Sequence, residues 1–289
     1  MLRKLRPFQY FLATSLSEAM SLLARYGQQA SIMAGGTDLL VFMKQGVKNP
    51  QYVIDIKGIP NLDYISYDDR EGLKIGPLAT LQSIVKSPIV QERYPLLGES
   101  AQAVGILQVR NRGTVTGNLC TASPSADMPP SLLALGARLK LASQEGERVV
   151  PLGDFFAGPF ETVLSSEEMV VEVQVPPPLP HSAGTYLWVP KQTAVDETLV
   201  GVATVVALSS HSQCREAHVA FASVAPMPMR ARKAEDFLRG QKLDDERISQ
   251  AAQVAARETS PRSRAEYRRH MSQVLTEKAL HESLSRIPW

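Results

Sequence analysis

A run of prolines near the middle of the chain limits how any fold can pass through it. Residues 175–180 read Val-Pro-Pro-Pro-Leu-Pro, so four of the five positions from Pro176 to Pro180 lack a backbone N–H donor and have a fixed φ angle. Neither a helix nor a central strand can cross this segment, which forms a stiff, extended connector. The sequence therefore predicts a domain boundary here, with mixed helix and strand on both sides.

Before the connector, short strands and helices alternate. After Ser15, apolar residues recur at helical spacing until Gly27, which predicts a capped helix over 16–26. Further helices are expected over 38–45 after a Thr37 cap, over most of 78–104 with breaks at Pro88 and Pro95, and over 127–136. Residues 109–121 show no helical period and contain Gly113 and Gly117, which predicts a loop with one strand-like piece. Strands are expected at 30–34, 52–56, 61–67, 72–75, 137–142, 148–151 and 169–175.

Beyond the connector the order of elements changes. Strands are expected at 186–192, 200–208 and 217–224, and helices at 230–240, 245–258 and 263–285. Strands followed by helices favour a sheet with helices on one face. The fold class predicted for the whole chain is α+β.

Charge and cysteine content exclude several function classes. A net charge of +2 gives no reason to expect nucleic acid as a partner, and no apolar run is long enough to span a membrane. We therefore expect a cytoplasmic protein. Cys120 and Cys214 are the two cysteines, too few for a thiolate zinc site or an iron–sulfur cluster with four thiolate ligands. If this protein moves electrons, its carrier is organic or the clusters lie on another chain.

A first candidate binding segment ends the strand at 30–34 and begins the next helix. Paired glycines let the backbone approach an anion closely, and free N–H groups at the start of a helix point toward it. The alternative is a tight turn that uses glycine only for its backbone freedom. The candidate residues are Ile32, Met33, Ala34, Gly35, Gly36, Thr37, Asp38 and Leu39.

A second candidate segment, residues 110–119, combines guanidinium, hydroxyl and amide groups with two glycines. Arg110 and Arg112 offer charge, and the glycine-containing turn offers backbone donors, for a ligand such as a diphosphate. An exposed basic turn is the alternative. The candidate binding residues here are Thr114, Val115, Thr116, Gly117 and Asn118.

Other chemistry has weaker support in the sequence. Asp127 is a candidate helix N-cap before Pro129 and Pro130, and it can also accept a hydrogen bond from a ligand hydroxyl. The five histidines show no metal-ligand spacing, and no hydrolase or metalloprotease motif occurs. Cys120 is expected to be a small buried side chain rather than a reactive thiol.

Taken together, the segments resemble a known family in their order along the chain. The matching stretches are 34–39 with 43–44 and 53–56, then 108–119 with 122–124 and Asp127, and finally Pro261 with 265–269 and 274–275. They are similar to the FAD-binding medium subunits of molybdenum hydroxylases, a family that includes the carbon monoxide dehydrogenase medium chain and the flavin segment of xanthine dehydrogenase. The sequence departs from the family at Thr116, where glycine is usual. It also lacks the cysteine-bearing insertion of the 4-hydroxybenzoyl-CoA reductase flavin subunit.

The resemblance implies a two-lobed FAD-binding domain of the PCMH type at residues 1–176 and a flavoprotein C-terminal domain at 183–287. Both candidate segments would bind the FAD diphosphate, and Asp127 would hydrogen-bond to FAD. Val104, Val170 and Lys191 lie at further flavin-contact positions of the family. A lysine beside the flavin would favour its reduced, anionic form. An ordinary surface lysine is the alternative for Lys191.

The resemblance also implies an electron-transfer role. Substrate would be oxidised at molybdopterin on a large subunit, and electrons would pass through [2Fe-2S] clusters on a small subunit to FAD on this chain and then to an external acceptor. A dimer of heterotrimers is the expected assembly, and no side chain of this chain need be catalytic. The alternatives are a stand-alone flavin oxidoreductase and a non-catalytic assembly subunit with a degenerate flavin site. Neither the substrate nor the acceptor follows from the sequence.

Overall fold

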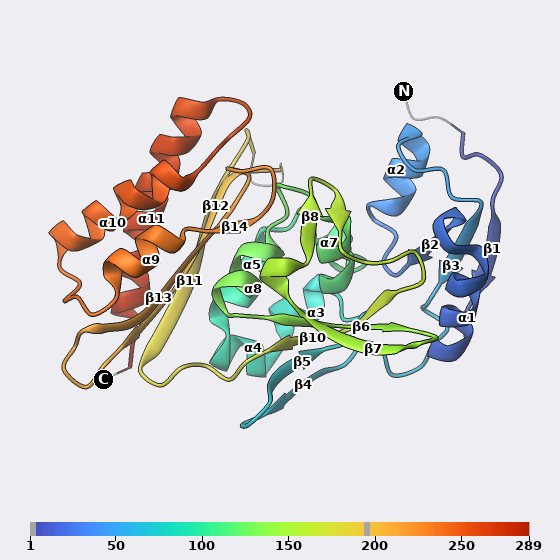
Figure 1. Cartoon of the computed structure of the whole chain (residues 1–289), viewed down its shortest axis with the longest axis horizontal. Helices are drawn as coiled ribbons and strands as arrows, with labels where there is room; N and C mark the ends of the chain where they lie inside the picture. Colours follow the sequence, from blue (N-terminus) through green and yellow to red (C-terminus); the bar gives the residue numbers. More distant parts are fainter. Residues whose placement is uncertain (1–3, 194–196, 289) are drawn as a thin grey trace.

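The computed structural model describes residues 4–193 and 197–288, which form three regions arranged in a row (Figure 1). The first region, lobe one, is a parallel three-stranded sheet in the order β1-β3-β2 with two helices. Its helix α1 has the predicted ends, because the Ser15 side chain accepts a hydrogen bond from the Glu18 N–H at 3.1 Å and Gly27 follows the last turn. The elements of lobe one are β1 (Gln9–Leu12), α1 (Leu16–Tyr26), β2 (Ala30–Met33), α2 (Leu39–Gln45) and β3 (Tyr52–Asp55).

Lobe two is built on an antiparallel five-stranded sheet in the order β4-β5-β10-β6-β7. The strand β10 at its centre is the last element before the connector, so the chain returns to the middle of this sheet before it leaves the lobe. The strands are β4 (Ile65–Asp68), β5 (Gly72–Ile75), β6 (Arg138–Ser143), β7 (Gly146–Pro151) and β10 (Met169–Val175), and a small separate hairpin is formed by β8 (Phe156–Gly158) and β9 (Glu161–Thr162).

Short helices cover lobe two, and prolines set where two of them begin. Pro88 and Pro95 each occupy the first turn of a helix, where a missing N–H breaks no intrahelical bond. The predicted breaks of the helical stretch 78–104 at Pro88 and Pro95 are confirmed, and the stretch contains three helices. The helices of lobe two are α3 (Leu81–Lys86), α4 (Pro88–Arg93), α5 (Pro95–Ala103), α6 (Leu107–Arg110), α7 (Val115–Thr121) and α8 (Met128–Ala134).

After the connector, the C-terminal region forms an antiparallel four-stranded sheet in the order β11-β12-β13-β14. The connector itself has no helix or strand, and the Tyr94 hydroxyl donates a hydrogen bond to the Pro176 carbonyl at 2.9 Å. The predicted order of strands followed by helices is confirmed. The elements are β11 (Ser182–Pro190), β12 (Thr198–Leu208), β13 (Cys214–Ala222), β14 (Met229–Arg230), α9 (Arg232–Leu238), α10 (Asp245–Glu258) and α11 (Ala265–Ser285).

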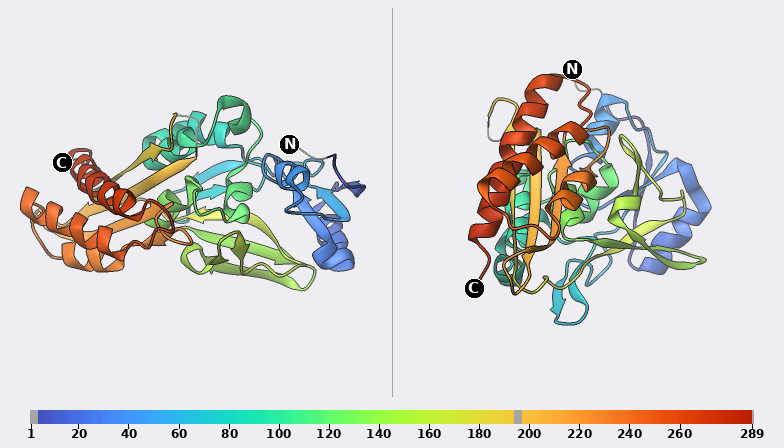
Figure 2. Two further views of the ribbon diagram at one scale, coloured as in Figure 1. Left: turned by 90° about the horizontal axis from the view of Figure 1, so that it is seen from above. Right: turned by 60° about the vertical axis from the view of Figure 1, so that its left-hand side comes forward.

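The C-terminal sheet is covered on both faces, although its own helices lie on one face only. Helix α11 packs along β12 and β11, while α5 and α8 of lobe two cover the opposite face (Figure 2). Every residue of β12 is consequently buried. Buried residues of this sheet, among them Tyr186 and Ala203, belong to the same apolar core as lobe two, so burial of apolar surface holds the two regions together.

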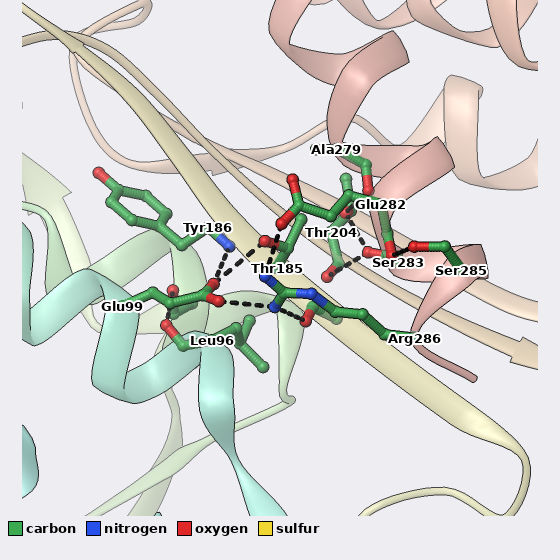
Figure 3. Close-up of polar contacts among 12 residues, drawn as sticks. Leu96, Glu99, Thr185, Tyr186, Thr204, Ala279, Glu282, Ser283, Ser285 and Arg286 are labelled. Atoms are coloured by element: carbon green, nitrogen blue, oxygen red, sulfur yellow. Dashed lines mark hydrogen bonds and ion pairs between the residues drawn. The ribbon is translucent and has the colours of Figure 1, made fainter. Parts of the chain in front are cut away.

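A cluster of three charged side chains, Arg286, Glu282 and Glu99, binds the end of the chain to lobe two. The guanidinium of Arg286, just after α11, donates to Glu99 Oε1 of α5 at 2.6 Å and to Glu282 Oε1 at 2.5 Å (Figure 3). The other Glu99 oxygen, Oε2, accepts from the Tyr186 backbone N–H at 2.8 Å and from the Thr185 hydroxyl at 3.1 Å. One carboxylate on α5 therefore binds both β11 and the C-terminal tail. Across the part of the chain described here, no helix is long and apolar enough to cross a membrane.

Replacing Glu99→Gln tests this connection. The amide oxygen still has acceptor capacity, but the ion pair to Arg286 is lost, so we expect the free energy of unfolding to fall by about 1–2 kcal/mol. Urea unfolding of the variant and the wild type measures the difference. Glu92→Gln, which breaks a pair between the exposed Glu92 and Arg93 side chains, is the control and should change stability by less than about 0.5 kcal/mol. Equal effects of the two substitutions would contradict the role given to Glu99.

Candidate functional site

A cavity of about 400 Å³ lies between lobes one and two. Its walls come from the loop that joins β2 to α2, from α7, and from the segment that leads into β10. A volume of this size is in the range of cofactor-binding clefts. Most of the residues that the sequence singled out line it: Ile32, Met33, Ala34, Gly35, Gly36, Thr37, Asp38, Leu39, Val104, Thr114, Thr116, Gly117, Asn118 and Val170.

The two glycines after β2 are required for different reasons. A Cβ atom on Gly35 would lie 2.0 Å from the carbonyl oxygen of Arg112, so no other residue fits where the two loops cross. Gly36 has φ +75°, a left-handed conformation that side chains oppose. No described residue accepts a hydrogen bond from the backbone N–H of Gly35, Gly36 or Thr37. The segment is thus a tight turn that also leaves backbone donors free beside the cavity.

The helix after this turn begins differently from the prediction. Thr37 does not cap α2; Asp38 holds the N-cap position, and its side chain makes no capping bond. Instead, Asp38 Oδ2 accepts a hydrogen bond at 2.8 Å from the hydroxyl of Thr121, at the end of α7. The first turn of α2 is therefore joined to lobe two across the cavity.

Most of the second candidate segment is helical, since Arg110 ends α6 and residues 115–119 belong to α7, so the prediction of a loop with a strand-like piece was wrong outside the turn at 111–114. Thr114 caps α7 by accepting a hydrogen bond from the Gly117 N–H at 2.9 Å, and Val115 and Leu119 are fully buried. Helix propensity is low here, because the segment holds a glycine and several β-branched residues. The cap and the burial of one face override that preference.

Two polar atoms of α7 are buried without any protein partner. They are Oγ1 of Thr116 and Oδ1 of Asn118, and both residues line the cavity. Thr116 lies within the helix and is not among the residues with positive φ, so it carries no left-handed strain. Buried polar atoms are costly when unpaired, and their presence together indicates a polar ligand.

The arginines of the second segment do not supply charge to this cavity. Arg110 is buried, and its Nη1 donates to the backbone carbonyls of Gln102, Val104 and Gly105 at 3.3, 3.3 and 3.0 Å. Arg112 lines a neighbouring cavity of about 300 Å³ rather than the first one. The expectation that both guanidinium groups face a bound diphosphate was therefore wrong for Arg110.

Residues 162–169 form one wall of the cavity that the sequence did not predict. The Glu168 side chain holds this wall in place. Its carboxylate forms a bidentate ion pair with Arg148 at 2.6 and 2.8 Å and accepts a hydrogen bond from the Ser165 N–H at 2.9 Å. Pairing with Arg148 lowers the pKa of Glu168 to about 2. No local motif marks this segment, because the pairing joins β7 to the loop before β10.

Three of the predicted binding residues do not line the cavity. Val115 is part of the apolar core. Lys191 pairs with Glu197 at 3.0 Å and is half exposed. Asp127 sits at the N-cap position of α8 without a capping bond, and its Oδ1 accepts hydrogen bonds from the hydroxyls of Tyr186 at 2.6 Å and Thr198 at 2.5 Å. A contact of these residues with a cofactor stays a prediction.

No nucleophile or metal centre is evident near the cavity. Cys120 lines it as a free thiol, but burial raises the pKa of this thiol to about 12, so it is protonated at neutral pH. Within residues 4–193 and 197–288, no cluster of three or more histidine, cysteine or acidic side chains is arranged to hold a metal ion.

Comparisons with known proteins agree with this organisation. Residues 6–178 match the model of the FAD binding domain in molybdopterin dehydrogenase, and residues 186–283 match that of the CO dehydrogenase flavoprotein C-terminal domain. The chain is 33% identical to the glyceraldehyde dehydrogenase medium chain of Sulfolobus acidocaldarius over 95% of this chain and 98% of that one. It is 32% identical to the carbon monoxide dehydrogenase medium chain of Hydrogenophaga pseudoflava, covering 96% and 98%.

A solved structure of carbon monoxide dehydrogenase from Hydrogenophaga pseudoflava, lacking the Mo-pyranopterin moiety of the molybdenum cofactor, superimposes with a TM-score of 0.94. The identity is 32%, and the match covers 99% of this chain and 100% of that chain. The likeness therefore extends over both lobes and the C-terminal region.

Asp127→Asn should change how stability depends on pH. Burial raises the pKa of Asp127 to about 6 from 3.8, despite the two hydroxyl donors. The folded protein thus binds this proton more tightly than the unfolded chain, and the resulting stability is present below pH 4 and lost as the pH rises through about 6. We expect the variant to gain about 2 kcal/mol relative to the wild type between pH 4 and 7.5.

Urea unfolding of both apoproteins at several pH values measures this difference. Asp63→Asn, at a surface position, is the control and should show no such trend. A difference between the Asp127 variant and the wild type that stays constant with pH would show that Asp127 does not hold a proton in the folded protein.

Proposed function

This chain belongs to the family of FAD-binding medium subunits of molybdenum hydroxylases, and on that premise we propose that FAD binds in the cavity between its two lobes. The chain is an oxidoreductase subunit that passes electrons from iron–sulfur clusters on a partner subunit, through FAD, to an external acceptor. The observation that carries the site assignment is the pair of buried polar atoms without a partner among the described residues, Thr116 Oγ1 and Asn118 Oδ1, on residues that line the same cavity as the glycine turn.

The residues of the cavity fit a dinucleotide with a diphosphate. The free N–H groups of Gly35, Gly36 and Thr37 are donors for phosphate oxygens, and the Thr116 hydroxyl is a further donor from the opposite lobe. Asn118 Oδ1 is an acceptor for a ligand hydroxyl. Neutral donors from both lobes bind the diphosphate without an arginine. This agrees with the contacts of Arg110, which binds backbone carbonyls of the protein instead.

Bound FAD supplies the redox chemistry, and the protein supplies binding, orientation and exclusion of solvent. The fixed turns on both sides hold their donors in place before the cofactor arrives, so little conformational entropy is lost on binding. The ion pair between Arg148 and Glu168 holds the far wall in the same way. The protonated Cys120 thiol in this lining is a poor nucleophile.

Partner subunits complete the proposed function. Large molybdopterin-binding and small iron–sulfur subunits are expected, since the relatives are medium chains of multi-subunit dehydrogenases. We propose a dimer of such heterotrimers located in the cytoplasm. Relatives with different substrates, glyceraldehyde and carbon monoxide, match this chain almost equally well, so the substrate is decided by the large subunit.

Flavin and metal analysis of the purified full chain tests the proposal. We expect one FAD per chain and no stoichiometric iron or molybdenum. Gly36→Val should abolish FAD binding, because valine is strained at φ +75° and its Cβ would press on Met33 Sδ at 3.3 Å. Gly153→Val, at a position with open space around it, is the control. Full flavin occupancy of the Gly36 variant, or no flavin in the wild type, would overturn the proposal.

Substitutions at Thr116 test the diphosphate contact. Thr116→Val keeps the side-chain volume and removes the hydroxyl, so FAD should bind about ten- to a hundredfold more weakly. Thr116→Gly also removes the hydroxyl but opens space for a closer approach of the backbone, and we expect a change of less than about tenfold. Titration of the apoproteins with FAD measures both. An unchanged Kd for the valine variant would mean that the hydroxyl makes no contact with FAD.

A further inference from the structure

The peptide that joins Ala34 to Gly35 is held by an ion pair between the partly exposed Lys57 side chain and the buried Asp55 carboxylate. Lys57 Nζ donates a hydrogen bond to the carbonyl oxygen of Ala34 at 2.9 Å, and it also pairs with Asp55 Oδ2 at 2.6 Å. Lys57 lines only the neighbouring cavity of about 300 Å³, whereas Ala34 and Gly35 line both cavities. The glycine turn therefore separates the two cavities. Lys57 binds this turn from the side of the second cavity, away from the proposed cofactor.

Asp55 is in turn fixed by several groups of lobe one. It is the last residue of β3 and is 2% exposed. Its Oδ1 accepts from the Lys57 N–H at 2.9 Å, and its Oδ2 accepts from the Tyr10 hydroxyl of β1 at 2.8 Å. Hydrogen bonds from Lys57 and Tyr10 outweigh the effect of burial and hold the pKa of Asp55 below its usual value. The ammonium of Lys57 thus has a rigid, charged support rather than a free surface position.

Because the peptide bond is planar, the hydrogen bond from Lys57 to the Ala34 carbonyl also fixes the direction of the next backbone N–H group, that of Gly35. In a trans peptide, the C=O and N–H groups point in opposite directions. With the Ala34 carbonyl held toward Lys57, the Gly35 N–H must point toward the opposite side of the glycine turn, where the first cavity lies. This N–H has no acceptor in the described protein.

Resting on the FAD site proposed above, we infer that Lys57, supported by Asp55, is a positioning residue that orients the Gly35 N–H toward the FAD diphosphate. Removing the anchor lets this peptide rotate, and the donor is then no longer fixed before FAD binds. Lys57 itself does not touch the cofactor. Its effect is specific to the part of FAD that the glycine turn contacts.

The test compares full-chain apoproteins with two substitutions at the anchor. Lys57→Met with Asp55→Asn removes the ion pair without leaving a buried unpaired carboxylate, and the Asn side chain retains an acceptor for Tyr10. We expect the Kd for FAD to rise about tenfold. We also expect the 31P resonances of bound FAD to shift relative to the wild type, since they report on the diphosphate surroundings.

Two further variants separate positioning from general stability. Lys57→Arg keeps a donor that can reach the Ala34 carbonyl and should restore FAD affinity to within about threefold. Lys140→Met breaks an ion pair with Glu147 at a lysine of equal exposure, 32%, on β6 of lobe two, and should leave both the Kd and the 31P resonances unchanged. Unchanged Kd and 31P resonances in the Lys57 and Asp55 double variant would overturn the inference, as would a failure of arginine to restore affinity. If the wild type binds no FAD, the proposed function itself fails.

Discussion

Lobes one and two meet at a contact between two backbones. The carbonyl of Arg112 occupies the place that a side chain on Gly35 would need, so the glycine turn and the start of α7 cross at van der Waals distance. This crossing separates the two cavities, and the first cavity is lined by the glycine turn of one lobe and by Thr116 and Asn118 of the other. Replacing Gly35 with any larger residue would force the lobes apart and remove the site.

Three cations around the cavity hold its walls, whereas Lys48 lines the cavity itself. Arg110 is bound to three backbone carbonyls, Lys57 to the Ala34 carbonyl, and Arg148 to Glu168. Their charges are satisfied inside the protein, and the cavity presents hydroxyl, amide and backbone groups beside the side chains of Lys48, Asp38 and Glu168. Such donors are pre-organised by the fold, so they bind an anion without rearrangement. This arrangement suits a cofactor that stays bound while its redox state changes.

The C-terminal region is joined to lobe two by an apolar core and by polar contacts at two points. Asp127, just before α8, is bound by hydroxyls of β11 and β12, and Glu99 on α5 is bound by β11 and by the chain end. Both acidic residues belong to the helices that cover the second face of the sheet. The C-terminal region therefore completes its own fold only against lobe two, although the two regions match separate family models.

Local pattern was enough to predict most elements and the glycine turn after β2. The Ser15 cap, the prolines that begin α4 and α5, and the order of strands and helices after the connector are all short-range features, and the glycine pair marked the turn beside the cavity. The helix α7, the burial of Asp127 and the partners of Arg110 and Glu168 were decided by the tertiary structure. Each depends on groups far apart in the sequence, such as Asp127 with Tyr186, or Lys57 with Ala34. The sequence determined where the chain turns and which residues bear polar groups. Only the packing of the lobes determined which of those groups form hydrogen bonds within the protein and which are left for a ligand. The reason is that burial and hydrogen bonding depend on which residues are neighbours in space.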